Sequence, residues 1–129
     1  MVIVWVKDLF FGSKIEAEAR AHHIPVCFVE SAREIPKAVR KHEASLFLLD
    51  LNASEKAVDV IRDIKSNSEL SSIRIVGFLS HVQADLADKA RRSGCDVILS
   101  RSIFVGRLPE IFEHYQAEIK SVEQPAAAL

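Results

Sequence analysis

Five short apolar runs, separated by longer helical patterns, constrain the fold of this chain more than any other feature. They cover residues 2–6, 26–29, 45–50, 73–79 and 96–100. Several of these runs are continuously apolar rather than alternating, as in the run LFLLD at 46–50. Continuous apolar strands are typical of a parallel sheet whose two faces are both covered by helices. The sequence therefore predicts strands that are buried on both sides.

Helical patterns fill the intervals between the runs, and several carry start or stop signals. The expected helices cover about 13–23, 31–42, 54–66 and 82–93, with a last one that includes 108–119. The segment SARE has the spacing of a capping box, in which Ser31 and Glu34 satisfy backbone groups at the helix start. Gly94 suits the position just after a helix end. Pro109 suits the first turn of the last helix.

The strict alternation of strands and helices, with short joins, favours a doubly wound α/β fold. We expect a five-stranded parallel sheet in the flavodoxin-like order 2-1-3-4-5, with about five helices on both faces. The chain has 129 residues, a length that fits a single domain. We assign that domain to residues 1–120 and a C-terminal tail to residues 121–129.

Composition and charge exclude several classes of protein. The net charge of −1 predicts no general attraction to nucleic acid or to a membrane. No apolar stretch approaches the roughly 20 residues that span a bilayer, and the N-terminal apolar run is too short for a signal peptide. We therefore expect a soluble, cytoplasmic protein. Cys27 and Cys95 form no C-x-x-C pair, and we expect both to be small buried apolar residues.

Polar side chains follow four of the five expected strands. Ligands of open α/β sheets bind beyond the carboxyl ends of the strands. Those ends carry, in chain order, Lys7 and Asp8, Asp50 and Asn52, Ser80 and His81, and Arg101. In the strand order 2-1-3-4-5 these side chains converge on one crevice that holds carboxylates, a hydroxyl, an amide and cations. The alternative is that each polar residue merely ends its strand.

Over nearly its whole length the chain resembles a response-regulator receiver domain of two-component signalling. The resemblance depends on Asp50 at the end of the third strand, on the order of the polar strand ends, and on the segment SGCDVILSRS. That segment is similar to the family's G-A-D-x-x-x-x-K-P pattern. The resemblance implies that Asp50 accepts a phosphoryl group from a histidine kinase. It places Ser80 and Arg101 at the positions of the hydroxyl and the cation that contact this group.

The resemblance also implies a Mg²⁺ site formed by Asp8, Asp50 and the backbone carbonyl of Asn52. Such an ion neutralises incoming phosphoryl charge and accepts carboxylate and carbonyl oxygens. Lys7, however, stands where the family has the first acid of a pair. Repulsion between its ammonium and a cation amounts to roughly 4 kcal/mol per unit pair at ~4 Å, with an effective dielectric near 20. Either Lys7 weakens the metal site and pairs with Asp50, or its stem points into solvent.

Further positions depart from the family pattern. Arg101 in place of Lys keeps the charge but not the shape of the side chain. Ser102 replaces a proline that usually follows a cis peptide bond, and we expect a trans bond here because a cis bond before a non-proline residue costs ~3 kcal/mol. His81 stands where the family commonly has Ala or Gly, and its bulk would narrow the mouth of the pocket. Ile98 occupies a position where many receivers carry a switching aromatic residue.

These features together predict a regulatory protein rather than an enzyme. One version is a stand-alone receiver phosphorylated on Asp50 by a histidine kinase or a phosphotransfer protein. The other is a pseudo-receiver, a protein-interaction module that works without phosphate. Either would act through a protein partner or a homodimer on the surface of the fourth helix, fifth strand and fifth helix.

An aspartate-nucleophile phosphatase is a remote alternative suggested by Asp50-x-Asn52, but those enzymes have a second acid two residues on.

Phe10 and Phe11 are adjacent in the chain, so we expect one to pack on the sheet and the other to lie exposed beside the pocket as a partner contact.

Overall fold

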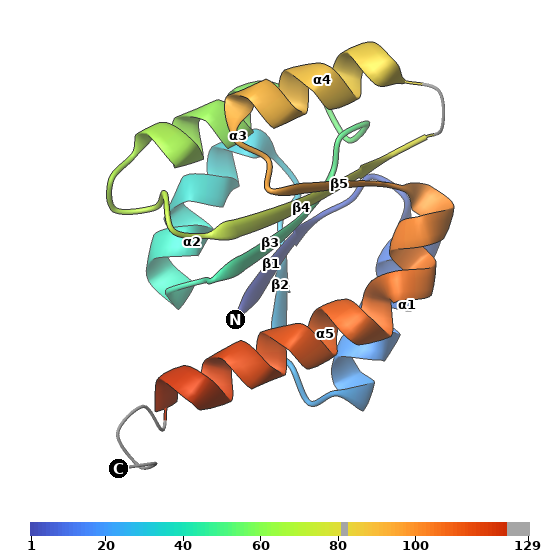
Figure 1. The fold of residues 1–129 in the computed structure, drawn as a ribbon, viewed down its shortest axis with the longest axis vertical. Coiled ribbons are helices and arrows are strands. Elements are labelled where there is room, and N and C mark those ends of the chain that lie inside the picture. The colour runs from blue at the N-terminus through green and yellow to red at the C-terminus, as the bar shows by residue number, and fades with distance from the viewer. Residues whose placement is uncertain (81–82, 124–129) are drawn as a thin grey trace.

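The computed structural model describes residues 1–80 and 83–123, with side chains through residue 117 (Figure 1). Its strands are β1 (Val2–Trp5), β2 (Val26–Phe28), β3 (Leu46–Asp50), β4 (Arg74–Leu79) and β5 (Val97–Ser100). Its helices are α1 (Leu9–Ala21), α2 (Ile35–His42), α3 (Ala57–Ser66), α4 (Ala84–Ser93) and α5 (Arg101–Glu123), with a 3₁₀ turn at Ala32–Glu34.

The five strands form one parallel sheet in the order β2-β1-β3-β4-β5. This confirms the predicted doubly wound fold and its strand order. β3 is the central strand, and all five of its residues are buried. In its register Leu48 lies between Val4 of β1 and Val76 of β4, so the three inner strands share a continuous apolar layer.

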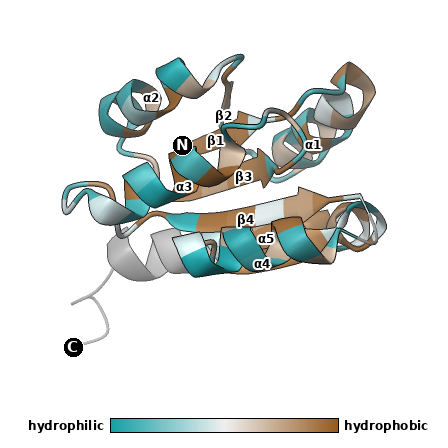
Figure 2. Ribbon diagram, turned by 90° about the horizontal axis from the view of Figure 1, so that it is seen from above, coloured by the Kyte–Doolittle hydropathy of each residue, from teal (hydrophilic) through white to brown (hydrophobic). Residues whose placement is uncertain are grey.

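Alternate residues of the strands build two separate cores, one on each face of the sheet. Phe47 and Leu49 belong to the core that α2, α3 and α4 cover, whereas Leu46 and Leu48 belong to the core under α1 and α5. Figure 2 shows the strands largely in brown, with teal concentrated on the helices. Burial of both faces explains why β1, β3 and β4 read as apolar runs and confirms the prediction for these strands, whereas the edge strands β2 and β5 are only partly buried.

The first and last helices begin earlier than the sequence predicts. α1 starts at Leu9 rather than at residue 13, because the Asp8 carboxylate accepts hydrogen bonds from two backbone N–H groups of its first turn. α5 starts directly after β5, where the Ser100 hydroxyl accepts from the Ile103 N–H at 3.4 Å. Pro109 therefore lies inside α5 and not in its first turn, so that prediction is wrong.

The capping box predicted at 31–34 is not formed, because Glu34 reaches the N–H of Glu30 and not that of Ser31. Ser31 makes no side-chain capping hydrogen bond, whereas a Glu34 carboxylate oxygen accepts from the Glu30 N–H at 2.7 Å. The turn between these residues is 3₁₀, which moves the helix start on to Ile35. The helix end at Gly94 is confirmed, since this residue adopts the left-handed conformation with φ of 112°.

Both cysteines are free thiols. Cys95 is buried in the core under α3 and α4, and burial raises the pKa of its thiol to about 11. This confirms its expected role as a small apolar residue. Cys27 is only partly buried, at the border of the same core.

α5 continues to Glu123, so the first three residues of the expected tail are helical. The boundary at residue 120 stays a prediction, and residues 124–129 lie outside the described part of the chain. Val82, expected to begin the fourth helix, also lies outside it. Among the described residues, no helix combines the length and the apolar character that a membrane crossing requires.

An ion pair joins the C-terminal end of α3 to the sheet. The Lys65 ammonium donates to the Ile73 carbonyl at 2.7 Å and to the Asp96 carboxylate at 3.0 Å. The same Asp96 oxygen accepts from the Ile75 N–H at 2.7 Å, at the start of β4. A Cβ at Gly94 would come within 2.7 Å of the Lys65 side chain, so the close packing of this corner also requires glycine.

Replacing Asp96 by Ala is expected to lower the free energy of unfolding by about 1–3 kcal/mol, because the buried Ile75 N–H loses its acceptor and Lys65 its counterion. Urea unfolding followed by circular dichroism measures the change. The matched control is Asp88→Ala, which removes an exposed ion pair with Arg92 and is expected to cost less than about 0.5 kcal/mol. Equal losses in the two variants would contradict an anchoring role for Asp96.

Candidate functional site

The candidate site lies at the carboxyl edge of the sheet, around Asp50. This residue ends the central strand and is 1% exposed, the sole polar or charged residue among the buried ones in the described part of the chain. One carboxylate oxygen accepts from the Asn52 N–H at 2.9 Å, and the other lies 3.4 Å from a guanidinium nitrogen of Arg101. Asp50 is therefore a buried carboxylate in an internal ion pair.

Three aromatic rings lie next to this ion pair. Phe78 is the register partner of Asp50 in β4, and its ring centroid lies 4.8 Å from that of Phe11 and 4.2 Å from that of Phe104. The Arg101 guanidinium sits 5.6 Å from the centroid of the Phe11 ring. These rings exclude water from one side of the pair, and a guanidinium over an aromatic face gains cation–π attraction. The sequence analysis did not identify this cluster, although Phe78 and Phe104 lie within four residues of a strand end.

Asn52 and Ser80 form a second set of contacts beside Asp50. The Asn52 side-chain oxygen accepts from the Ser80 N–H at 3.1 Å and lies 3.4 Å from its hydroxyl. The structure thus brings Ser80 and Asn52 to the same edge as Asp50, as predicted from strand order. The described contacts of Asn52 involve its N–H and side chain, and those of the Ser80 hydroxyl involve Asn52 rather than Asp50.

The residues after β1 take a different arrangement from the one that a metal site needs. Asp8 is the N-cap of α1, and its Oδ1 accepts from Phe10 N–H at 2.8 Å and from Phe11 N–H at 3.4 Å. Lys7 is exposed and forms no ion pair with the described residues, Asp50 included. Of the two alternatives for Lys7, the structure has the side chain directed to solvent. Arg101 is the cation that pairs with Asp50.

The carboxylates at this edge already carry hydrogen bonds. Each Asp50 oxygen has one donor, and Oδ1 of Asp8 accepts from the first turn of α1, whereas the other Asp8 oxygen has no donor among the described contacts. The described residues contain no group of three or more His, Cys, Asp or Glu side chains that could hold a metal ion. A Mg²⁺ site formed by Asp8, Asp50 and the Asn52 carbonyl stays a prediction.

The segment after β5 places Arg101 directly at the first position of α5. No cis peptide bond occurs in the described residues, which agrees with the trans bond expected before Ser102. The Nε atom of Arg101 is buried and has no hydrogen-bond partner among the described residues. Arg101 therefore offers one contact to Asp50 instead of a bidentate one, and it retains an unused buried donor.

An exposed apolar patch borders the site. Leu9 is 88% exposed and Phe10 is 70% exposed, both in the first turn of α1, and Ile103 is 48% exposed in the first turn of α5. Phe11 is buried against the sheet, so the prediction that only one of the adjacent phenylalanines packs inward is confirmed. The predicted effect of His81 on the pocket mouth lies outside the described residues.

No sequence model of a protein family matches the chain, and no curated protein matches it by sequence. Solved structures do match it in fold. The receiver domain of NtrX from Brucella abortus superposes with a TM-score of 0.75 at 14% identity, covering 88% of this chain and 96% of that chain. The phosphorylated cyanobacterial phytochrome response regulator RcpA gives a TM-score of 0.70 at 21% identity, covering 89% and 90%.

A third match is the Mn²⁺-bound form of the response regulator Rcp1, with a TM-score of 0.71 at 18% identity, covering 85% of this chain and 90% of that chain. Together with the strand order, these matches show that the chain has the fold of response-regulator receiver domains. The expected fold resemblance is confirmed over nearly the whole described chain.

Replacing Asp8 distinguishes a helix cap from a metal ligand. Asp8→Ala is expected to cost about 1 kcal/mol of unfolding free energy, whereas Asp8→Ser keeps a capping oxygen and is expected to cost only a few tenths. The comparison is made by urea unfolding with and without Mg²⁺. A cost that appears only in the presence of Mg²⁺ would contradict the capping role.

A double-mutant cycle measures the Asp50–Arg101 pair. Arg101→Met leaves a buried carboxylate with one donor, whereas Asp50→Asn removes the charge that needs a partner. We expect a coupling energy of roughly 1–2 kcal/mol between the two substitutions in urea unfolding. This energy is smaller than for a fully buried pair, because Arg101 is partly exposed to solvent. A coupling energy below about 0.5 kcal/mol would mean that the pair adds nothing to the fold.

Proposed function

We propose that this chain is a regulatory module that uses the receiver fold for protein contacts without phosphorylation of Asp50. The observation that carries the proposal is the ion pair between the buried Asp50, at the end of the central strand, and the partly exposed Arg101. The receiver fold supports a regulatory rather than an enzymatic role.

The chemistry of phosphoryl transfer supports this version. An attacking carboxylate needs an accessible oxygen in line with the donor, together with a divalent ion to neutralise the charge. Asp50 is 1% exposed and both of its oxygens have donors. Lys7 stands where the family has an acid, and Asp8 uses one oxygen to cap α1, so fewer carboxylate oxygens are available for the ion. The guanidinium of Arg101 already supplies beside Asp50 the positive charge that a metal ion would otherwise bring.

A second candidate is a phosphorylation-competent receiver, and one observation favours it. Ser80, Asn52 and Arg101 gather at the same edge as Asp50, which is the set that would contact a phosphoryl group. In this version Mg²⁺ binds at Asp8, Asp50 and the Asn52 carbonyl, and Arg101 turns from the carboxylate toward the phosphoryl oxygens. A histidine kinase or a phosphotransfer protein would then be the donor.

The aspartate-nucleophile phosphatase is not supported. The residue two positions after Asp50 is Asn52, an amide that cannot act as the required acid, and its side chain is bound to Ser80.

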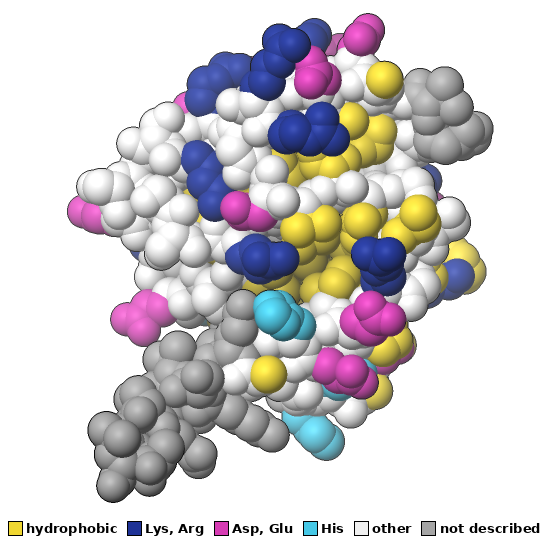
Figure 3. Space-filling model, viewed as in Figure 1, with side chains coloured by type: hydrophobic (Ala, Val, Ile, Leu, Met, Phe, Trp, Pro, Cys, Tyr) yellow, Lys and Arg dark blue, Asp and Glu magenta, His cyan; other side chains and the backbone are white. Residues whose placement is uncertain are grey.

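A regulatory module needs a surface that binds a partner. Figure 3 shows hydrophobic side chains gathered between α4 and α5, with Lys and Arg side chains beside them. The α4–β5–α5 surface is the proposed site for a protein partner.

The proposal predicts that wild-type protein incubated with acetyl phosphate and Mg²⁺ gains no phosphoryl adduct in intact-mass spectrometry. The double variant Lys7→Asp/Arg101→Lys restores the acid and the lysine that the family has, and it is expected to gain one adduct per chain. Adding Asp50→Asn to this variant removes the adduct and identifies the acceptor.

A phosphoryl adduct on the wild type that disappears in Asp50→Asn would overturn the proposal and establish the second candidate. Mg²⁺ binding is followed in parallel through the fluorescence of Trp5, the one tryptophan of the chain, whose strand position is beside Leu49. Wild-type fluorescence is expected to stay unchanged through millimolar Mg²⁺.

A further inference from the structure

A groove separates β5 from the middle of α5, on the side of the sheet opposite to α3 and α4. Its volume is about 450 Å³. Its walls are mainly apolar, from the early parts of β3, β4 and β5 and from α5: Leu46, Val76, Val97, Leu99, Ile111 and Tyr115. Volumes of 300–1,000 Å³ with apolar walls and a few polar groups are typical of small-molecule sites.

The position of α5 accounts for the groove. The helix buries Phe104, Leu108 and Phe112 in the core that it shares with α1. It thus packs over the inner strands, and the edge strand β5 is left only partly covered, with all four of its residues partly exposed. The groove is therefore a consequence of where α5 finds its core contacts.

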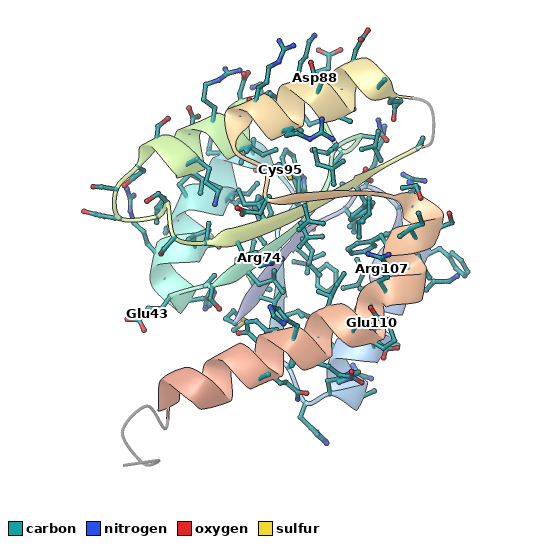
Figure 4. All side chains as sticks on the ribbon, viewed as in Figure 1. Glu43, Arg74, Asp88, Cys95, Arg107 and Glu110 are labelled. Carbon is teal, nitrogen blue, oxygen red and sulfur yellow. The ribbon has the colours of Figure 1, made fainter. Side chains whose placement is uncertain are left out.

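Two arginines at the rim of the groove have no partner for their charge. Arg74 at the start of β4 and Arg107 on α5 line the groove, and neither guanidinium forms a hydrogen bond or an ion pair among the described residues. Figure 4 labels both, with Glu110 beside Arg107 on the same helix. Glu110 is the one acid among the lining residues, so the rim carries a net positive charge before His114 is considered.

We propose that this groove binds a small apolar anion, a free molecule with a hydrocarbon body and a carboxylate. The body covers Val97, Leu99 and Ile111, and the carboxylate pairs with Arg74 or Arg107, because a guanidinium fork matches a carboxylate in shape and charge. A second copy of the chain fits less well, since a two-fold contact would face these arginines with the same arginines and a single Glu110. The inference deepens the proposed function, for it supplies a phosphate-independent input to the same domain.

The test uses decanoate as the anion and decan-1-ol as its neutral counterpart. Decanoate is titrated below its micelle concentration into ¹⁵N-labelled wild-type protein, and backbone amide shifts are recorded. We expect saturable binding of one decanoate per chain, with the largest shifts at Val97, Leu99 and Ile111. Decan-1-ol is expected to bind at least about tenfold more weakly, since it lacks the charge.

The variant Arg74→Glu/Arg107→Glu is expected to weaken decanoate binding by about tenfold or more. The matched control is Arg91→Glu/Arg92→Glu, which changes the net charge equally on the exposed side of α4 and is expected to leave the affinity unchanged. Circular dichroism checks that both variants are folded.

Several results would overturn the proposal. These are no saturable decanoate binding up to millimolar concentration, shifts centred on Leu9 and Phe10, or equal weakening by the control variant. A dimer that buries the groove, or binding to phosphatidylglycerol vesicles without binding to free decanoate, would also contradict it. Phosphorylation of Asp50 by acetyl phosphate refutes the proposed function but leaves the decanoate titration as an independent result.

Discussion

A parallel sheet that is buried on both faces can carry polar side chains only where its strands end. The central strand of this protein shows the constraint in its purest form, because four apolar residues precede Asp50 and each lies in a core. The polar side chains of the sheet therefore concentrate at its two edges, where the strands begin and end. The carboxyl edge collects the candidate site, and the opposite edge collects the Lys65–Asp96 anchor and one end of the β5–α5 groove.

The Asp50–Arg101 pair resolves an electrostatic problem that this constraint creates. A carboxylate at 1% exposure has lost its hydration, and the cost of that loss must be offset by donors. In a metal-dependent receiver an ion would take part in this compensation. Here a guanidinium and a backbone N–H provide it within the chain. The described contacts of the Asp50 carboxylate are thus all made by groups of the chain itself.

The sequence was sufficient for the fold because the strand pattern, the crossover rule and Gly94 all act locally or through simple topology. It was also sufficient to predict that Asp50, Asn52, Ser80 and Arg101 meet at one edge, because strand ends converge once the strand order is known. The sequence did not reveal where the first and last helices begin, at Leu9 and Arg101. Asp8, predicted to bind a metal, caps α1 through one of its two oxygens, a role that an aspartate before a helix often takes, and the metal role stays a prediction. Pro109 was read as a start signal because nothing local revealed that α5 begins at Arg101.

The partner of Asp50 also lay beyond the reach of the sequence. Lys7 follows β1, which lies next to β3, and Arg101 follows β5, which lies two strands away. Which of these two cations reaches the Asp50 carboxylate depends on side-chain direction and on the ring of Phe11. Such three-dimensional contacts leave no periodic pattern in the chain. The same holds for the Phe11–Phe78–Phe104 cluster, whose members lie far apart in the sequence and meet only after the sheet has formed.

The direct junction of β5 and α5 has a mechanical consequence. No loop residue separates Ser100 from Arg101, so the last peptide of the edge strand is also the base of the longest helix. A helix that begins without a loop takes the position of its first residue from the strand before it. The backbone of Arg101 beside Asp50 is therefore placed by the pairing of β5 with β4 as well as by the core contacts of α5.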